Sequence, residues 1–163
     1  MARAGRPLNS NPISESISYK IEKGNIEEVK NILIENKIDL EDSYLRTPLI
    51  WASFYNNVDL LIWLIDNGAN INHQDKNGYS ALHFVAQENC KNVVEILLNN
   101  GIDVELEDFY GNTALWTAVF NAKGNNEIVE LLLDSGANFN HLNKNNKTPK
   151  EMAETFGGFE KYI

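Results

Sequence analysis

The feature that most constrains this chain is an internal repeat with a period of about 33 residues, a length typical of solenoid proteins. Similar tripeptides recur at that spacing, at Thr47-Pro48-Leu49, Ser80-Ala81-Leu82 and Thr113-Ala114-Leu115. A fourth, Thr148-Pro149-Lys150, follows after a slightly longer interval. Five positions before each tripeptide stands an aspartate or an asparagine: Asp42, Asp75, Asp108 and Asn143. One such short unit cannot bury its apolar face alone and must stack on its neighbours.

Each unit has the sequence signals of two short helices and a turn. Thr47 can cap a helix that begins at Pro48, where the missing backbone N–H costs no hydrogen bond. After a polar break, apolar residues from Val58 to Ile65 recur at three- and four-residue spacing, as on one face of a second helix. Gly68 then suits the left-handed conformation in which helices often end. The sequence therefore predicts an all-α fold built from helix pairs.

Composition and charge narrow the function classes. Hydrophobic residues make up 43% and charged residues 23% of the chain, as in ordinary globular domains. No apolar stretch approaches the length of about 20 residues that a membrane span requires, so we expect no membrane partner. The single cysteine, Cys90, cannot form an internal disulfide, and we expect a cytoplasmic location. A net charge of −9 disfavours nucleic acid and favours a protein partner with a basic face.

The repeats resemble the ankyrin repeat, whose pattern D-x-x-G-x-T-P-L-H-x-A-A followed by V-V-x-x-L-L-x-x-G-A is matched closely from Asp75 to Ile102. The resemblance implies an ankyrin-repeat solenoid of about five stacked helix-turn-helix units with projecting finger turns. Residues 1–12 are expected to be a disordered leader or an added segment, and 13–163 the repeat domain. Its expected units are an N-terminal cap at 13–41, repeats at 42–74, 75–107 and 108–142, and a C-terminal cap at 143–163.

Departures from the family pattern mark particular repeats. Only His83 keeps the histidine of the first helix, which the resemblance implies ties the start of that helix to the preceding turn. Trp116 stands at the equivalent position one repeat later. Leu45 stands where Gly78 and Gly111 stand in the next two repeats, so we expect the turn at Leu45 to need a different geometry.

No residue pattern in the sequence points to catalysis. The three histidines include His73 and His141, which are about two repeats apart and therefore too distant to share a metal ion. Cys90 has no basic neighbour except Lys91 to lower its pKa. Glu105, Glu107 and Asp108 cluster on a finger, where carboxylates are usually solvated. We therefore predict that the protein is not an enzyme and binds no cofactor or metal.

The resemblance also implies a partner-binding face. In ankyrin-like stacks the fingers and first helices line a concave surface. Carried over by position, its candidate contact residues are Ser43, Tyr44, Arg46, Phe54, Tyr55, Lys76, Asn77, Tyr79, Gln87, Glu88, Phe109, Tyr110, Asn112, Phe120 and Asn121. Seven of these fifteen are aromatic, against 10% of the whole chain, and exposed aromatic residues are enriched at interface hot spots. The alternative is that Phe54 and Phe120 pack between first helices as core. Trp116, near the same face, is a further candidate for either role.

Three functions fit these expectations. The first is a non-catalytic module, monomeric on its own, that binds one protein partner through the concave face. The second narrows the first: this short, acidic, Asn- and Ile-rich chain resembles stand-alone bacterial ankyrin proteins, some of which are immunity proteins that inhibit a toxin, and a host-directed bacterial effector fits equally. The third is a structural scaffold that self-associates through its outer helices, which exposure of Trp51 and Trp63 would favour.

Overall fold

Over residues 11–157, 159, 161 and 162, which are those that the structure describes, the computed structural model contains nine α-helices. In chain order they are α1 (Pro12–Glu22), α2 (Ile26–Glu35), α3 (Pro48–Phe54), α4 (Val58–Asp66), α5 (Ala81–Glu88), α6 (Lys91–Asn99), α7 (Ala114–Asn121), α8 (Glu127–Asp134) and α9 (Pro149–Phe156). Within this part of the chain, no helix has the length and hydropathy needed to cross a membrane.

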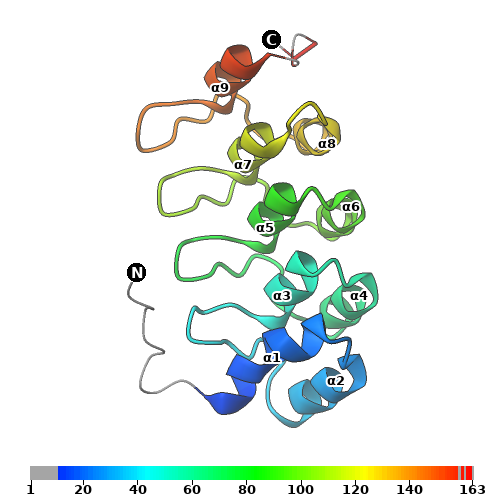
Figure 1. Ribbon diagram of the computed structural model, residues 1–163. Helices are drawn as coiled ribbons and strands as arrows, with labels where there is room; N and C mark the ends of the chain where they lie inside the picture. Colours follow the sequence, from blue (N-terminus) through cyan, green and yellow to red (C-terminus); the bar gives the residue numbers. More distant parts are fainter. Residues whose placement is uncertain (1–10, 158, 160, 163) are drawn as a thin grey trace.

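The helices form two layers of a solenoid (Figure 1). One layer contains α1, α3, α5, α7 and α9, and the other contains α2, α4, α6 and α8. Each odd-numbered helix packs on the next odd-numbered one, and α4, α6 and α8 pack in the same order behind them. Long loops project as fingers from the first layer, on the side away from the second. The predicted all-α stack of helix pairs is confirmed.

The helices begin where the sequence predicts. The Thr47 hydroxyl accepts a hydrogen bond from the backbone N–H of Ile50, and Pro48 occupies the first helical position of α3. At α9 the Thr148 hydroxyl accepts from Glu151 N–H at 3.1 Å, and the Glu151 carboxylate accepts from Thr148 N–H at 3.3 Å. Such reciprocal caps satisfy backbone donors that the helix itself leaves unpaired.

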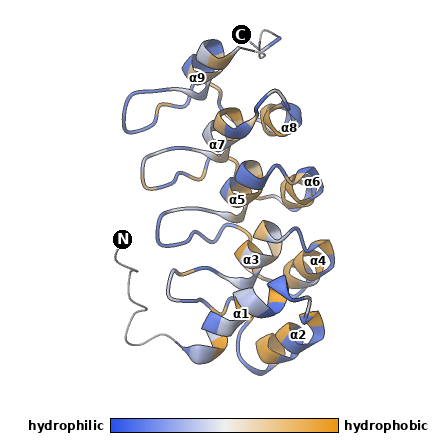
Figure 2. Cartoon of the chain, viewed as in Figure 1, coloured by the Kyte–Doolittle hydropathy of each residue, from blue (hydrophilic) through white to orange (hydrophobic). Residues whose placement is uncertain are grey.

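The core lies between the two layers. In Figure 2 hydrophobic residues are concentrated in the helices of the second layer, while the fingers are mostly hydrophilic. The fully or almost fully buried residues of α4, α6 and α8 share one stripe: Leu60, Leu61, Leu64, Val93, Val94, Leu97, Ile128, Val129 and Leu132. Trp51 and Trp63, in contrast, are half-buried. A Lys30 ammonium lies 5.8 Å from the centre of the Trp63 ring.

The two ends differ from the internal repeats. Helix α1 begins at Pro12 and is capped by the Asn11 side chain, so the first helix starts one residue before the boundary predicted at 13. Residues 1–10 of the predicted leader lie outside the described residues. At the other end, α9 is the last helix of the described chain, and the buried Phe159 follows it.

The fingers are closed by one repeated turn. The Oδ1 atom of Asp75 accepts from the backbone N–H groups two and four residues later, at 2.8 and 3.0 Å. The corresponding oxygens of Asp42, Asp108 and Asn143 do the same. The third residue after each of these side chains has a positive φ, which is 80° at Gly78 and 59° at Leu45. The expectation of a different geometry at Leu45 is therefore wrong: the carboxylate holds the turn even where the residue has a Cβ.

Backbone hydrogen bonds join neighbouring fingers in register. Lys76 N–H donates to Tyr44 O at 2.9 Å, Phe109 N–H to Asn77 O at 2.8 Å, and Lys144 N–H to Tyr110 O at 3.0 Å. A Cβ at Gly78 would stand 2.9 Å from the Cα of Asp108, so a larger residue at this position would require the neighbouring finger to shift. Residues one period apart along the chain are consequently neighbours on the same face.

Candidate protein-binding surface

The concave face has two adjacent intervals that differ in packing. The first interval is the space between α3 and α5, lined by residues 46–54 and 79–87. The second is the space between α5 and α7, lined by residues 79–87 and 112–121. Because the repeat period relates them position by position, each side chain in one interval has a counterpart in the other.

Aromatic rings and one arginine fill the first interval. The Phe84 ring contacts Phe54 edge-on at 6.0 Å between centroids. The Arg46 guanidinium lies 5.2 Å from the centre of Phe84 and 5.0 Å from that of Trp51, and its Nε donates to Asp75 Oδ2 at 3.1 Å. Tyr55, also a candidate, stacks on Trp51 at 5.9 Å. The structure thus places Arg46, Phe54 and Tyr55 half-buried within the chain's own packing.

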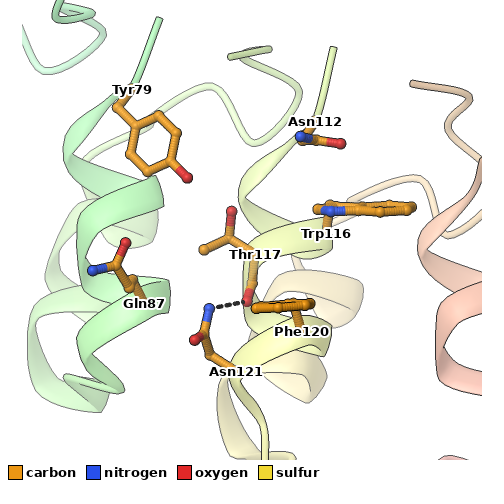
Figure 3. A pocket seen from close by; sticks show the side chains of 7 residues that line it. All are labelled: Tyr79, Gln87, Asn112, Trp116, Thr117, Phe120 and Asn121. Atoms are coloured by element: carbon orange, nitrogen blue, oxygen red, sulfur yellow. Dashed lines mark hydrogen bonds between the residues drawn. The ribbon is translucent and has the colours of Figure 1, made fainter. Parts of the chain in front are cut away.

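Smaller polar residues replace this aromatic pair in the second interval. Gln87 is the counterpart of Phe54 one repeat later, and Thr117 is the counterpart of Phe84. Loss of both rings leaves a hollow of about 420 Å³. Figure 3 shows the side chains around it: Tyr79, Gln87, Asn112, Trp116, Thr117, Phe120 and Asn121. Six of these seven are candidate contact residues, which the fold brings together.

The walls of the hollow are held by hydrogen bonds and stacking. Asn121 Nδ2 donates to Thr117 O at 2.8 Å, as drawn in Figure 3. The Tyr79 ring lies 5.0 Å from the His83 ring and 5.3 Å from the Phe84 ring, between centroids. Burial and the neighbouring Asp108 carboxylate raise the pKa of Tyr79, so its hydroxyl stays protonated at neutral pH. Phe120 is 61% exposed at the edge of the hollow.

His83 and Trp116 show why the two repeats differ. Buried His83 bonds through Nδ1 to the Ser80 hydroxyl at 2.9 Å and through Nε2 to Asn112 O at 3.0 Å. This agrees with the tie between helix and turn that the resemblance implies. Burial lowers the pKa of His83, which keeps the ring neutral. One repeat later the buried Thr113 hydroxyl has no hydrogen-bond partner among the described residues. The half-buried Trp116 indole offers no acceptor there, and it lines the hollow instead.

Two exposed rings extend the surface onto the finger that precedes α7. Phe109 and Tyr110 are 68% and 61% exposed and meet edge-on at 5.6 Å between centroids. A second pocket, of about 340 Å³, lies between the fingers that precede α5 and α7 and shares Tyr79 with the hollow. Its lining residues are Asn77, Tyr79, Asp108, Phe109 and Tyr110. The remaining candidates Tyr44, Lys76, Gln87 and Glu88 are exposed, and Ser43 is half-buried.

Sequence reasoning missed two residues of this surface. Thr117 is the smaller residue that opens the hollow, and its departure from Trp51 and Phe84 at the equivalent position of the earlier repeats was the available signal. Phe156, on α9, is 55% exposed and lies 6.3 Å from Phe120 between ring centroids. No sequence signal separated Phe156 from core, because the segment after Thr148 departs from the pattern of the internal repeats.

Cys90, His73 and His141, the side chains most able to take part in catalysis or metal binding, contact carboxylates or backbone carbonyls of the chain itself. Burial and the Glu88 carboxylate raise the pKa of the Cys90 thiol, which disfavours the nucleophilic thiolate. His73 Nε2 lies 2.7 Å from Leu45 O, and the His141 ring lies between Glu105 and Glu107 at 3.3 and 3.2 Å. Among the described residues, no group of three or more histidine, cysteine and acidic side chains is arranged to hold a metal ion.

A stack of helix pairs with projecting, hydrogen-bonded fingers defines a repeat-protein scaffold. The family model for ankyrin repeats (3 copies) matches residues 15–75 and 55–143, and the chain belongs to the ankyrin-repeat family. The chain is 32% identical over 145 residues to alpha-latrotoxin-Lg1a of Latrodectus geometricus, covering 87% of this chain and 10% of the toxin. It is also 32% identical over 125 residues to human transient receptor potential cation channel subfamily A member 1. That match covers 74% of this chain and 11% of the channel subunit.

The match to a viral relative covers a larger share of that relative's length. The chain is 35% identical over 108 residues to the putative ankyrin repeat protein FPV031 of Fowlpox virus, which covers 64% of this chain and 31% of that protein. The chain therefore spans between about a tenth and a third of these relatives. A toxin and an ion channel share the repeats, so the relatives agree on the scaffold and not on one activity.

Proposed function

We propose that this chain is a non-catalytic module that binds a protein partner through the C-terminal half of its concave face. One observation carries the proposal: aromatic residues fill the first interval but surround an open hollow in the second. Ankyrin repeats generally serve as protein-interaction modules. What the structure adds is a difference between two halves of one face, and the open half carries the more exposed rings: Phe109, Tyr110 and Phe120 are 61–68% exposed, against 45% for Tyr44.

The open half has the features of an interface hot spot. Phe109, Tyr110 and Phe120 each expose more than half of their surface. Such rings anchor well in a partner because they bury much apolar area and lose little rotamer freedom. The turn carboxylates and the backbone bonds between fingers fix the rings' supports in advance. A partner would therefore lose little free energy in ordering this surface.

Charge selects the kind of partner. The chain carries −9 overall, and Glu88, in the last turn of α5, and Glu107, on the finger that precedes α7, are exposed. Long-range attraction of this kind accelerates encounter with a basic protein and weakens as salt screens it. We therefore propose a partner with a basic face, bound by a monomer of this chain in the cytoplasm, where the single cysteine stays reduced.

Inhibition of a bacterial toxin is one specific form of this function. An acidic face with aromatic anchors suits blocking a basic active site, and recovery of a toxin as the bound partner would establish that role. A host protein as the bound partner would establish an effector instead. The scaffold alternative depends on exposed tryptophans, and Trp51 and Trp63 are half-buried, with the Trp51 ring stacked on Tyr55.

The test uses affinity capture from the native cell, followed by matched tyrosine substitutions. Tyr110→Ala should weaken binding of the captured partner by about 2 kcal/mol without lowering the melting temperature. Tyr19→Ala is the matched control, since Tyr19 is 60% exposed but lies on α1 at the other end of the stack. Equal affinity of the two variants would contradict the proposed surface.

A further inference from the structure

We propose that the pocket between the fingers that precede α5 and α7 binds an arginine side chain of the protein partner. The inference rests on the proposed function and adds the chemical group that the partner presents. Asp108, only 5% exposed, contributes to the lining of this pocket of about 340 Å³. Rings of Tyr79, Phe109 and Tyr110 supply most of the remaining lining.

The chain itself contains an occupied counterpart one repeat earlier. Asp75, equally buried, accepts from Arg46 Nε at 3.1 Å through Oδ2. The same guanidinium lies 5.3 Å from the centre of the Tyr44 ring, besides its contacts with Trp51 and Phe84. Here a buried carboxylate and aromatic rings hold an arginine supplied by the preceding finger. The arrangement is a precedent within this chain for an arginine paired with the turn carboxylate.

The next repeat keeps the carboxylate but not the cation. Asp108 is the counterpart of Asp75 one repeat later, whereas Tyr79 is the counterpart of Arg46. Asp108 Oδ1 accepts from Tyr110 N–H at 2.7 Å and Asn112 N–H at 2.9 Å, and Oδ2 accepts from the neutral amide Asn112 Nδ2 at 3.1 Å. Among the described residues, Asp108 has no ion pair. A buried carboxylate without a cation retains a strong preference for one.

Arginine fits the pocket better than lysine. A planar guanidinium can stack on an aromatic face while its N–H groups reach a carboxylate, whereas a lysine ammonium is a compact, strongly hydrated charge. The Lys144 ammonium already lies 5.3 Å from the Phe109 ring centre and donates to Phe109 O at 2.7 Å. The half-buried Tyr79 ring packs against His83 and Phe84, so the exposed Tyr110 ring is the main stacking surface for an incoming guanidinium.

The preference of the pocket for arginine can be tested with small-molecule probes before the partner is identified. N-acetyl-arginine methylamide is titrated into ¹⁵N-labelled protein at low salt, and the neutral isostere N-acetyl-citrulline methylamide is titrated in parallel. The arginine probe should shift the Tyr110 and Asn112 amides saturably and bind about tenfold tighter than the citrulline probe, since charge assistance strengthens the hydrogen bond. Equal binding of the two probes would overturn the assignment.

Two substitutions sharpen the result. Asp108→Asn removes the charge, and the turn should survive because Asn143 already accepts the same two backbone bonds, at 2.9 and 3.0 Å. That variant should bind both probes equally weakly. Tyr79→Arg places the chain's own arginine at the position of Arg46 and should block the probe. Unchanged arginine affinity in Asp108→Asn would refute the site.

Failure of this inference can be told from failure of the proposed function. If the arginine and citrulline probes bind equally while Tyr110→Ala still weakens partner binding, the proposed partner surface is supported and the arginine assignment is wrong. If the arginine probe binds but the partner tolerates Tyr110→Ala, the pocket exists and the proposed partner surface is wrong.

Discussion

The two intervals of the concave face have the same backbone arrangement but differ in side-chain packing. Between α3 and α5, the Phe54 and Phe84 rings meet and Arg46 closes over them. Between α5 and α7, Gln87 and Thr117 stand at the matching positions and leave a hollow. Each unit has its turn, its cap and its buried stripe in common with the next. Two residues per interval therefore decide whether the face is packed or open.

The comparison shows where a repeat protein can vary. Residues that close the turns and fill the seam between layers are repeated, because every unit needs them to stack. Residues that face the concavity are not needed for stacking and can vary. Trp116 therefore stands at the position of His83, although the Thr113 hydroxyl then lacks the hydrogen bond that His83 makes with Ser80 and has no partner among the described residues.

The largest expected effect is on the packed interval. Phe84→Ala should lower the free energy of unfolding by about 3–5 kcal/mol, since it removes a buried ring that contacts Phe54, Tyr79 and Arg46. Phe109→Ala, which removes a ring that is 68% exposed, should cost less than about 0.5 kcal/mol. Urea denaturation measures both. Similar losses for the two variants would mean that the intervals do not differ in packing.

A smaller effect on the free energy of unfolding, spread over a range of pH, is expected from the protonation of His83. Because burial lowers the pKa of folded His83 below its unfolded value of about 6.5, the unfolded chain binds the extra proton first. Stability is complete above that pH and falls as the pH drops toward the folded pKa. His83→Gln should start from lower stability but lose less of it over the same acid range. An equally steep acid loss in that variant would show that other groups cause it.

Much of the fold follows from the sequence because its signals are local and repeated. The caps at Thr47 and Thr148 and the buried stripe around Leu97 depend on the spacing of neighbouring residues. The turn at Leu45 departs from expectation because a rule for single residues, that positive φ favours glycine, is weaker than the two backbone bonds to Asp42.

The site could be predicted only in outline. Family position indicates which residues face the concavity, but it does not distinguish Phe54 from Phe120. Their difference depends on neighbours in the adjacent repeat: Phe54 packs on the buried Phe84, whereas Phe120 contacts Phe156, which is itself exposed. Such contacts between repeats involve the sizes of several side chains at once, which a position-by-position comparison does not include.

The most direct test is the partner's affinity for Phe54→Ala and Phe120→Ala, two identical changes at equivalent positions. Phe120→Ala should weaken binding by about 1 kcal/mol or more and leave the melting temperature unchanged, because the ring lies at the open interval. Phe54→Ala should lower the melting temperature and leave the affinity of the folded protein unchanged. Loss of binding in Phe54→Ala together with full affinity in Phe120→Ala would contradict the account.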